Sequence, residues 1–160
     1  TIPSDPNTVV SPADGRIVDI SYGCSVPWSE KQFTRISTYL NLFNVHVNRF
    51  PMSGEVFLRN HKKGSFLPAF RPKSSDLNEH EVIGVKTEFG DMFVKQIAGC
   101  MARRIVCRVN EGDRLATGSL YGMIKFGSRV ELFLETDLPV RVKTGDTVKA
   151  GETVIASYQS

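Results

Sequence analysis

The fold of this chain is decided by residues 121–134, YGMIKFGSRVELFL. β-Forming residues recur on both sides of Gly127-Ser128, which predicts two strands that meet at a break. A glycine can hold backbone angles closed to other residues, and it leaves its carbonyl open to a neighbouring nucleophile. The hydroxyl of Ser128 could be that nucleophile. Taken alone, however, the dipeptide is explained more simply by a β-bulge or a tight turn.

Strands and turns are also predicted on either side of this stretch. A turn at residues 12–15 lies between short strands that form a hairpin or a β-corner, and a loop is expected at 21–31. Strands follow within 33–47, and the segment Glu88-Phe89-Gly90-Asp91 marks a hairpin between two further strands. Residues 98–103 form either a short helix or more strand. The fold class is therefore mainly β, a single-domain β-sandwich or barrel-sandwich-like fold with one or two short helices.

Composition limits the kind of protein this is. The 160 residues suffice for one domain spanning 1–160, and a net charge of +3 does not argue for nucleic acid. The three cysteines, Cys24, Cys100 and Cys107, have neither disulfide nor zinc spacing, so we expect a reducing compartment and no metal. No apolar run approaches the roughly 18 residues that cross a bilayer.

Asp14 and His46 carry the other candidate chemistry. Asp14 lies on the turn at 12–15, where capping the bend is its simplest role. His46 lies between valines in NVHVNRFP, which suits a buried imidazole, either hydrogen-bonded in the core or catalytic. His61 and His80 lie among polar residues and are expected to be solvated. The basic and aromatic residues of 59–75 predict a long loop that could sit on an anionic lipid surface or tuck its aromatics into the core.

Five segments occur in one order: VVSPADG, NLFNVHVNRFP, QIAG followed by ARRIVC, YGMIKFGSRVEL and GDTVKAGETVIA. Together they resemble the phosphatidylserine decarboxylases of the short prokaryotic (archaeal and bacterial) type, over nearly the whole chain. The resemblance implies a pyruvoyl-dependent lyase that converts phosphatidylserine to phosphatidylethanolamine. It also implies a proenzyme that cleaves itself between Gly127 and Ser128, giving a β subunit (1–127) and an α subunit (128–160).

The resemblance also implies residue roles. Ser128 becomes the covalent pyruvoyl cofactor, His46 is the acid and base, and Asp14 orients His46, as in a Ser/His/Asp triad. Arg49 and Phe126 are substrate-binding candidates, although a structural ion pair suits Arg49 equally well. Two departures stand out: Phe-Gly-Ser-Arg replaces the Leu-Gly-Ser-Thr of longer members, and Arg49 stands where they have a second histidine, so His46 could serve both maturation and turnover.

The expected partners are phosphatidylserine, a membrane surface bound peripherally on its cytoplasmic face, the complementary fragment and a second copy in a homodimer. The hydrophobic membrane-associating segments with which full-length short forms usually begin are not in this chain, so we expect a trimmed form. Two alternatives remain open at this point. The glycine turns of the tail also suit a lipoyl-like or sugar-transport carrier domain, and a pyruvoyl enzyme could act on a soluble amino acid instead of a lipid.

Overall fold

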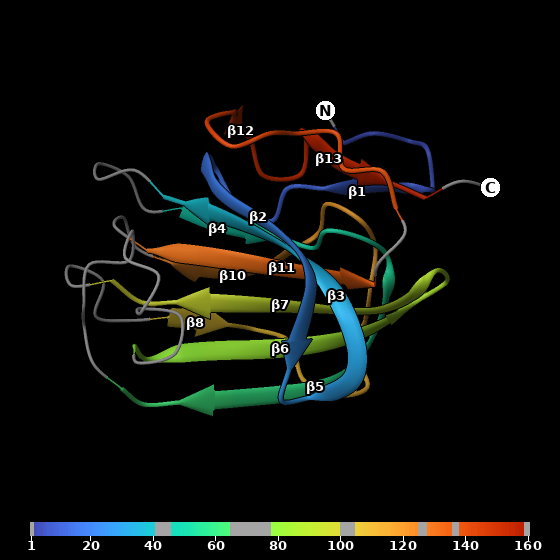
Figure 1. Cartoon of the computed structure of the whole chain (residues 1–160). Helices are drawn as coiled ribbons and strands as arrows, with labels where there is room; N and C mark the ends of the chain where they lie inside the picture. Colours follow the sequence, from blue (N-terminus) through green and yellow to red (C-terminus); the bar gives the residue numbers. More distant parts are fainter. Residues whose placement is uncertain are drawn as a thin grey trace.

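The protein is described here from a computed structural model, which covers residues 2–40, 46–64, 78–99, 105–124, 128–135 and 138–158. As predicted, it is mainly β, with sheets stacked in a sandwich-like single domain (Figure 1). None of these residues belongs to a helix, so the described part of the chain holds no helix that could cross a membrane. The segment 98–103, where a short helix is one expectation, lies mostly outside the described residues.

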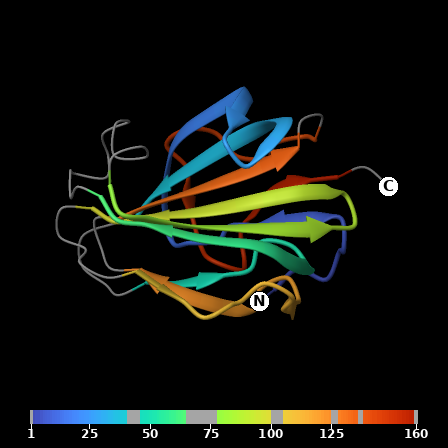
Figure 2. The ribbon, with the colours of Figure 1, turned by 90° about the horizontal axis from the view of Figure 1, so that it is seen from below.

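The largest sheet is antiparallel, in the order β12-β2-β3-β11-β7-β6-β5-β9. A smaller sheet, β4-β10-β8, forms a second layer, which Figure 2 shows beneath the large one, and β1 pairs with β13. The strands are β1 (Thr8–Val10), β2 (Gly15–Val26), β3 (Ser29–Tyr39), β4 (His46–Arg49), β5 (Gly54–Lys62), β6 (His80–Thr87), β7 (Gly90–Ile97), β8 (Ile105–Cys107), β9 (Arg114–Leu115), β10 (Leu120–Ile124), β11 (Arg129–Glu135), β12 (Thr147–Val148) and β13 (Val154–Ser157).

The two strands predicted around Gly127-Ser128 are β10 and β11, and they belong to different sheets. β10 is the middle strand of the small sheet, whereas β11 lies between β3 and β7 in the large one. The break predicted from the sequence is therefore the place where the chain passes from one layer to the other.

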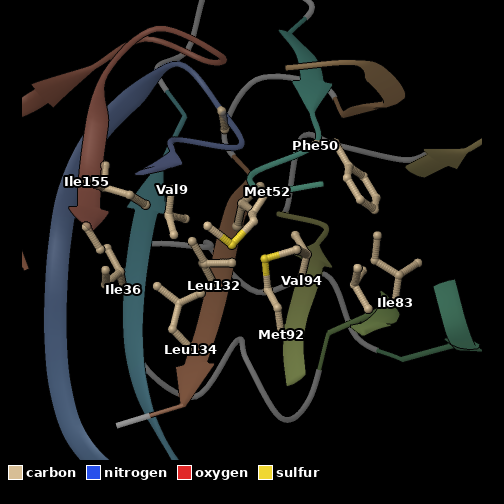
Figure 3. Packing of buried hydrophobic residues seen from close by; sticks show 14 of the residues in the cluster. Val9, Ile36, Phe50, Met52, Ile83, Met92, Val94, Leu132, Leu134 and Ile155 are labelled. Atoms are coloured by element: carbon tan, nitrogen blue, oxygen red, sulfur yellow. The ribbon is translucent and has the colours of Figure 1, made fainter. Parts of the chain in front are cut away.

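Strand β11 is buried on both faces. Val130, Leu132 and Leu134 enter the main core between the layers, part of which Figure 3 shows. Phe133, on the opposite face, joins a second apolar cluster with Phe33 and Phe93. Because alternate residues of a strand point to opposite faces, the charged residues Arg129 and Glu131 share that outer face, and both are almost fully buried.

The hairpin β2–β3 replaces the loop expected at residues 21–31, so that prediction is wrong. Its strands bend over the outer face of the large sheet, and Figure 1 shows them crossing in front of it. The turn-forming residues of this segment lie at irregularities in the pairing of β2 with β3, including one around Gly23, which has a φ of 64°. The turn at 12–15 is a corner, since β1 pairs with β13 while β2 pairs with β3.

The predicted loop at 59–75 begins later than expected, because β5 continues to Lys62. Arg59 lies opposite Ile83 in the pairing with β6, and its Nε donates to the carboxylate of Glu81 at 2.6 Å. Residues 65–77 lie outside the described part of the chain. The predicted hairpin around residues 88–91 is confirmed as the connection between β6 and β7.

We expect Leu132→Ala to lower the free energy of unfolding by about 3 kcal/mol, because it deletes a large side chain from the centre of the main core. Leu132 is only 1% exposed. Urea unfolding followed by circular dichroism would measure the loss. The matched control is Leu120→Ala at a leucine that is 58% exposed, where we expect a change below about 0.5 kcal/mol. Equal losses in the two variants would contradict this description of the core.

Candidate active site at the crossing between sheets

Ser128 lies immediately before β11 and is fully buried. Its carbonyl accepts a hydrogen bond from the Leu40 amide at 2.9 Å, which continues the pairing of β3 with β11 by one residue. On the other side, β7 pairs with β11 as far as Ile97 opposite Arg129. The backbone at position 128 is thus held by β3, one residue before the pairing with β7 begins. Alternation along β11 assigns Ser128 to the core face with Val130, and Arg129 to the outer face.

Asp14 lies at the same end of the large sheet, at the start of β2. Arg16 of β2 pairs with Tyr39 of β3, and Tyr39 pairs in turn with Arg129 of β11. Arg16 and Arg129 are therefore separated by two strand spacings, about 10 Å. The Asp14 side chain is exposed, and its Oδ1 accepts a hydrogen bond from the Ala150 amide at 2.6 Å. One role of this carboxylate is therefore structural: it holds the turn that follows β12.

His46 begins β4, and its backbone pairs with Ile124, the last residue of β10. Since Ile124 precedes Ser128 by four residues, strand pairing brings His46 to the same end of the molecule as the predicted cleavage point. β4 also lies against the turn that carries Asp14, because the Arg49 amide donates to the Pro12 carbonyl at 3.0 Å. The topology thus gathers the three predicted residues at one end of the sandwich. The His46 imidazole, Phe126 and Gly127 lie outside what is described.

A buried pair of amides links these elements, and the sequence analysis missed it. Gln96 of β7 donates from Nε2 to Asn48 Oδ1 at 2.7 Å and to the Val106 carbonyl at 3.3 Å. Asn48 in turn donates from Nδ2 to the Pro12 carbonyl at 3.4 Å. Gln96 lies opposite Val130, and Asn48 is two residues from His46. The pair therefore joins the two layers beside Ser128, on the strand that carries His46.

The sequence contains only a weak signal for this bridge. Asn48 lies only two residues after the candidate base His46, which marks it as a polar residue close to the site in the sequence. Gln96, however, is far from Asn48 in the sequence, and nothing local to either residue indicates its partner.

Arg49 lies at the other end of β4 from His46. Its guanidinium donates from one terminal nitrogen to the Gly118 carbonyl at 2.7 Å, and its side chain packs beside Gly151. This contact supports the turn at residues 116–119. A role for Arg49 in holding substrate stays a prediction, as does that of Phe126.

The expectation that His80 is solvated is wrong. His80 is the first residue of β6 and is 8% exposed, and its Nδ1 lies 2.9 Å from the Asn78 carbonyl. It lies on the outer face of the sheet, whereas its acidic neighbour Glu81 lies on the core face. There Glu81 bonds to Nδ1 of the partly exposed His61 at 2.7 Å. Polar neighbours in the sequence were misleading because alternation sends them to the opposite side.

Burial lowers the pKa of His80 below its ordinary 6.5, and the positive charges of Lys95 and Lys62 lower it further, against the raising effect of the Asn78 carbonyl. Above pH 6.5 the histidine is neutral in both the folded and the unfolded chain. As the pH falls below this value, the unfolded chain takes up the proton first, so the folded state loses stability until the folded pKa is passed.

We therefore expect His80→Gln to weaken the dependence of stability on pH in this window. Urea unfolding at about pH 7.5 and about pH 5.5 would measure it, with wild type as the control for all other titrating groups. An unchanged loss of stability between the two pH values would show that His80 does not contribute.

Comparison with known proteins identifies the family. The sequence profile described as phosphatidylserine decarboxylase matches residues 1–156. The chain is 44% identical over 161 residues to a phosphatidylserine decarboxylase proenzyme from Wolbachia sp. subsp. Brugia malayi (strain TRS), and 43% identical to that of Wolbachia pipientis wMel. Each alignment covers 98% of the chain and 70% of the relative. It is also 47% identical to a protein of Methanococcoides burtonii provisionally named as an archaetidylserine decarboxylase proenzyme, over 94% of the chain and 66% of that protein.

These matches include the tail, whose glycine turns suggested a carrier domain, so that alternative is set aside. They also agree with the order of the five segments in the sequence. The chain belongs to the phosphatidylserine decarboxylase family of enzymes.

Proposed function

We propose that this protein decarboxylates the serine headgroup of phosphatidylserine, after cleaving its own chain between Gly127 and Ser128. The observation that carries the proposal is the place of Ser128, fully buried where the chain passes between the two sheets, in a family whose relatives are named proenzymes.

Maturation begins when Ser128 Oγ attacks the Gly127 carbonyl, and the peptide bond becomes an ester as the nitrogen of Ser128 is released as an amine. Loss of the proton on Cα and of the ester oxygen then separates the chains, leaving a carboxylate on Gly127. Water replaces the nitrogen at position 128, and ammonia and a pyruvoyl group result. The attack by Ser128 needs a base to take the hydroxyl proton, because a serine hydroxyl is a weak nucleophile. The loss of the proton on Cα needs a base as well.

His46 is the proposed base, and Asp14 its orienting partner. A carboxylate in this position fixes the imidazole tautomer and stabilises the imidazolium. Support comes from the pairing of His46 with Ile124 and from the register of the large sheet, which puts the start of β2, next to Asp14, at the end where Ser128 lies. Asp14 would then combine this role with its hydrogen bond to the Ala150 amide.

The residues around position 128 fit a pyruvoyl group, which is no bulkier than the serine from which it forms. Such a group supplies a ketone conjugated to a carbonyl, which can accept the electrons released as carbon dioxide leaves. The Leu40 amide already donates to the carbonyl of residue 128, and this hydrogen bond would draw electron density toward that oxygen. His46 is the proposed proton donor to the substrate carbon.

The proposed substrate is a phospholipid with a serine headgroup, and phosphatidylserine is favoured by the names of two relatives. The third relative is named for archaetidylserine, which raises the alternative of a different lipid bearing the same headgroup. Arg49 and Phe126 are the proposed contacts to substrate. Lys62 and Lys63 are exposed cations that suit a membrane surface. Arg59 suits it less well, because its guanidinium is hydrogen-bonded to Glu81. We place the enzyme peripherally on the cytoplasmic face of the membrane.

The two fragments are expected to stay together after cleavage. β11 lies between β3 and β7 in the middle of the large sheet, β12 pairs with β2, and β13 pairs with β1. The α subunit therefore contributes strands to two sheets whose other strands belong to the β subunit. A further association of two copies into a homodimer is also proposed.

Mass spectrometry and an activity assay on purified protein test the proposal together. We expect two masses separated at Gly127-Ser128, with the smaller fragment lighter by one ammonia than the same fragment beginning with serine. The fragments should co-elute under native conditions and separate in denaturant. We expect carbon dioxide release with vesicles of phosphatidylserine. The rate of this release is compared with the rates for archaetidylserine vesicles and for free serine. A full-length chain that releases no carbon dioxide from any of them would refute the proposal.

A further inference from the structure

A cavity of about 720 Å³ lies on the outer face of the large sheet, beneath the tip of the β2–β3 hairpin. Its floor comes from β11, β7 and the end of β6, and its roof from residues 25–28. Alternation along β11 puts this cavity on the side of the sheet opposite to Ser128. It is therefore separate from the candidate active site, and its volume falls in the range usual for small-molecule sites.

Basic side chains outnumber carboxylates among the described residues that line the cavity. The described residues of its wall include four basic side chains and one carboxylate, namely Arg35, Lys62, Lys95, Arg129 and Glu131. Glu131 is shared, because Arg129 Nε donates to it at 3.2 Å and Lys95 lies opposite it in the register. Both of these cations are less than 10% exposed. Removing positive charge from water is costly unless negative charge is nearby, and an anion in the cavity would add negative charge beside Arg129 and Lys95.

Arg35 adds an unsatisfied donor. Its terminal nitrogen bonds to Asp19 at 2.9 Å on the rim, but its Nε is buried, and no hydrogen-bond partner for it is found among the described residues. A buried N–H without an acceptor is costly, and an anion in the cavity would supply one. Burial is the main cause of the lowered pKa of His80, which also lines the cavity, and the positive charges of Lys95 and Lys62 lower this pKa further.

The other side of the cavity is apolar. Trp28 lies against Phe133 with ring centroids 5.9 Å apart, and Lys95 Nζ lies 5.9 Å from the Trp28 ring. Cations on one side and an aromatic wall on the other suit a ligand with an anionic group and a small organic part. Arginine and lysine together are the usual partners of phosphate oxygens.

We propose that this cavity binds a phosphate ester, with Arg35, Lys95 and Arg129 around the phosphate, Lys62 at the entrance, and Trp28 against the organic part. The site does not depend on cleavage or decarboxylation at Ser128. The phosphate could belong to a soluble ester or to the headgroup of a lipid.

Calorimetric titration of the purified protein with glycerol 3-phosphate and with inorganic phosphate tests the site. The variants are Lys95→Gln and Lys62→Gln, and the second changes an exposed side chain, so its folding is secure. The matched control is Lys143→Gln, which removes the same charge from an exposed residue after β11. Vesicles of phosphatidylcholine with and without phosphatidylglycerol form the lipid arm, measured by co-sedimentation.

We expect saturable binding that weakens about tenfold in Lys95→Gln, less in Lys62→Gln, and less than about twofold in the control. Binding of the soluble phosphates assigns the site to a free ester. Binding to phosphatidylglycerol vesicles alone, with the same order of variants, assigns it to a lipid headgroup. The proposal is overturned if nothing binds at millimolar concentration, or if all three variants bind as wild type does.

Discussion

Ser128→Ala is expected to remain one uncut chain of 17.8 kDa, while the wild-type protein separates into fragments 1–127 and 128–160. Without the hydroxyl there is no oxygen to attack the Gly127 carbonyl, so the ester cannot form. Decarboxylation should disappear as well, because the pyruvoyl group derives from the same residue. Denaturing electrophoresis and intact mass, taken over several days of incubation, would measure the result.

A buried serine on the neighbouring strand provides the control for this experiment. Ser37 of β3 is fully buried, and its hydroxyl lies 3.5 Å from the Glu131 carboxylate on the outer face. Ser37→Ala removes the same atom from the same sheet and should still cleave. If Ser128→Ala is cut at the wild-type rate, or if Ser37→Ala also remains intact, the hydroxyl at 128 is not the nucleophile.

Gln96→Leu is expected to slow self-cleavage by about 100-fold, since a displacement of about 1 Å of a reacting group can cost that much. Gln96 holds Asn48 across the two layers at 2.7 Å, and Asn48 lies two residues from His46. Leucine leaves the buried oxygen of Asn48 without its donor, which should also cost about 1–3 kcal/mol of stability. The cleavage half-time, followed by electrophoresis after refolding, measures the first effect.

Two controls separate positioning from stability in this experiment. Gln32→Leu makes the same change at an exposed residue of β3, and it should alter neither quantity much. Val85→Ala removes buried apolar volume from the far end of β6, so it should destabilise the protein without slowing cleavage. If Val85→Ala and Gln96→Leu slow cleavage equally, the amide bridge has no positioning role beyond its contribution to folding.

Several elements could be predicted from the sequence because their cause is local. The hairpin of β6 and β7 follows from alternating residues around Glu88-Phe89-Gly90-Asp91, and the turn-and-strand pattern gives a mainly β domain. The site candidates Ser128, His46 and Asp14 came from short segments whose order resembles a known family. Topology brings all three to one end of the sandwich, while the roles proposed for them await the experiments above.

Other features depend on partners distant in the chain. The turn-like composition of residues 21–31 predicted a loop, but pairing of β2 with β3 and packing of Trp28 on Phe93 and Phe133 stabilise a hairpin there. His80 is buried on the outer face of the sheet, where it lines the same cavity as residues 25–28 of that hairpin. In both cases the local pattern was misleading, because the strands that decide the pairing and the burial are distant in the chain.

By itself, the sequence determined that Gly127-Ser128 interrupts two β-strands, because alternation and a glycine are properties of adjacent residues. Only the tertiary structure decided that these strands lie in different sheets, that Ser128 is buried toward the core, and that Arg129 faces a cationic cavity on the other side. The physical reason is that a strand has two faces and two edges, and its own residues do not specify which segments will cover them.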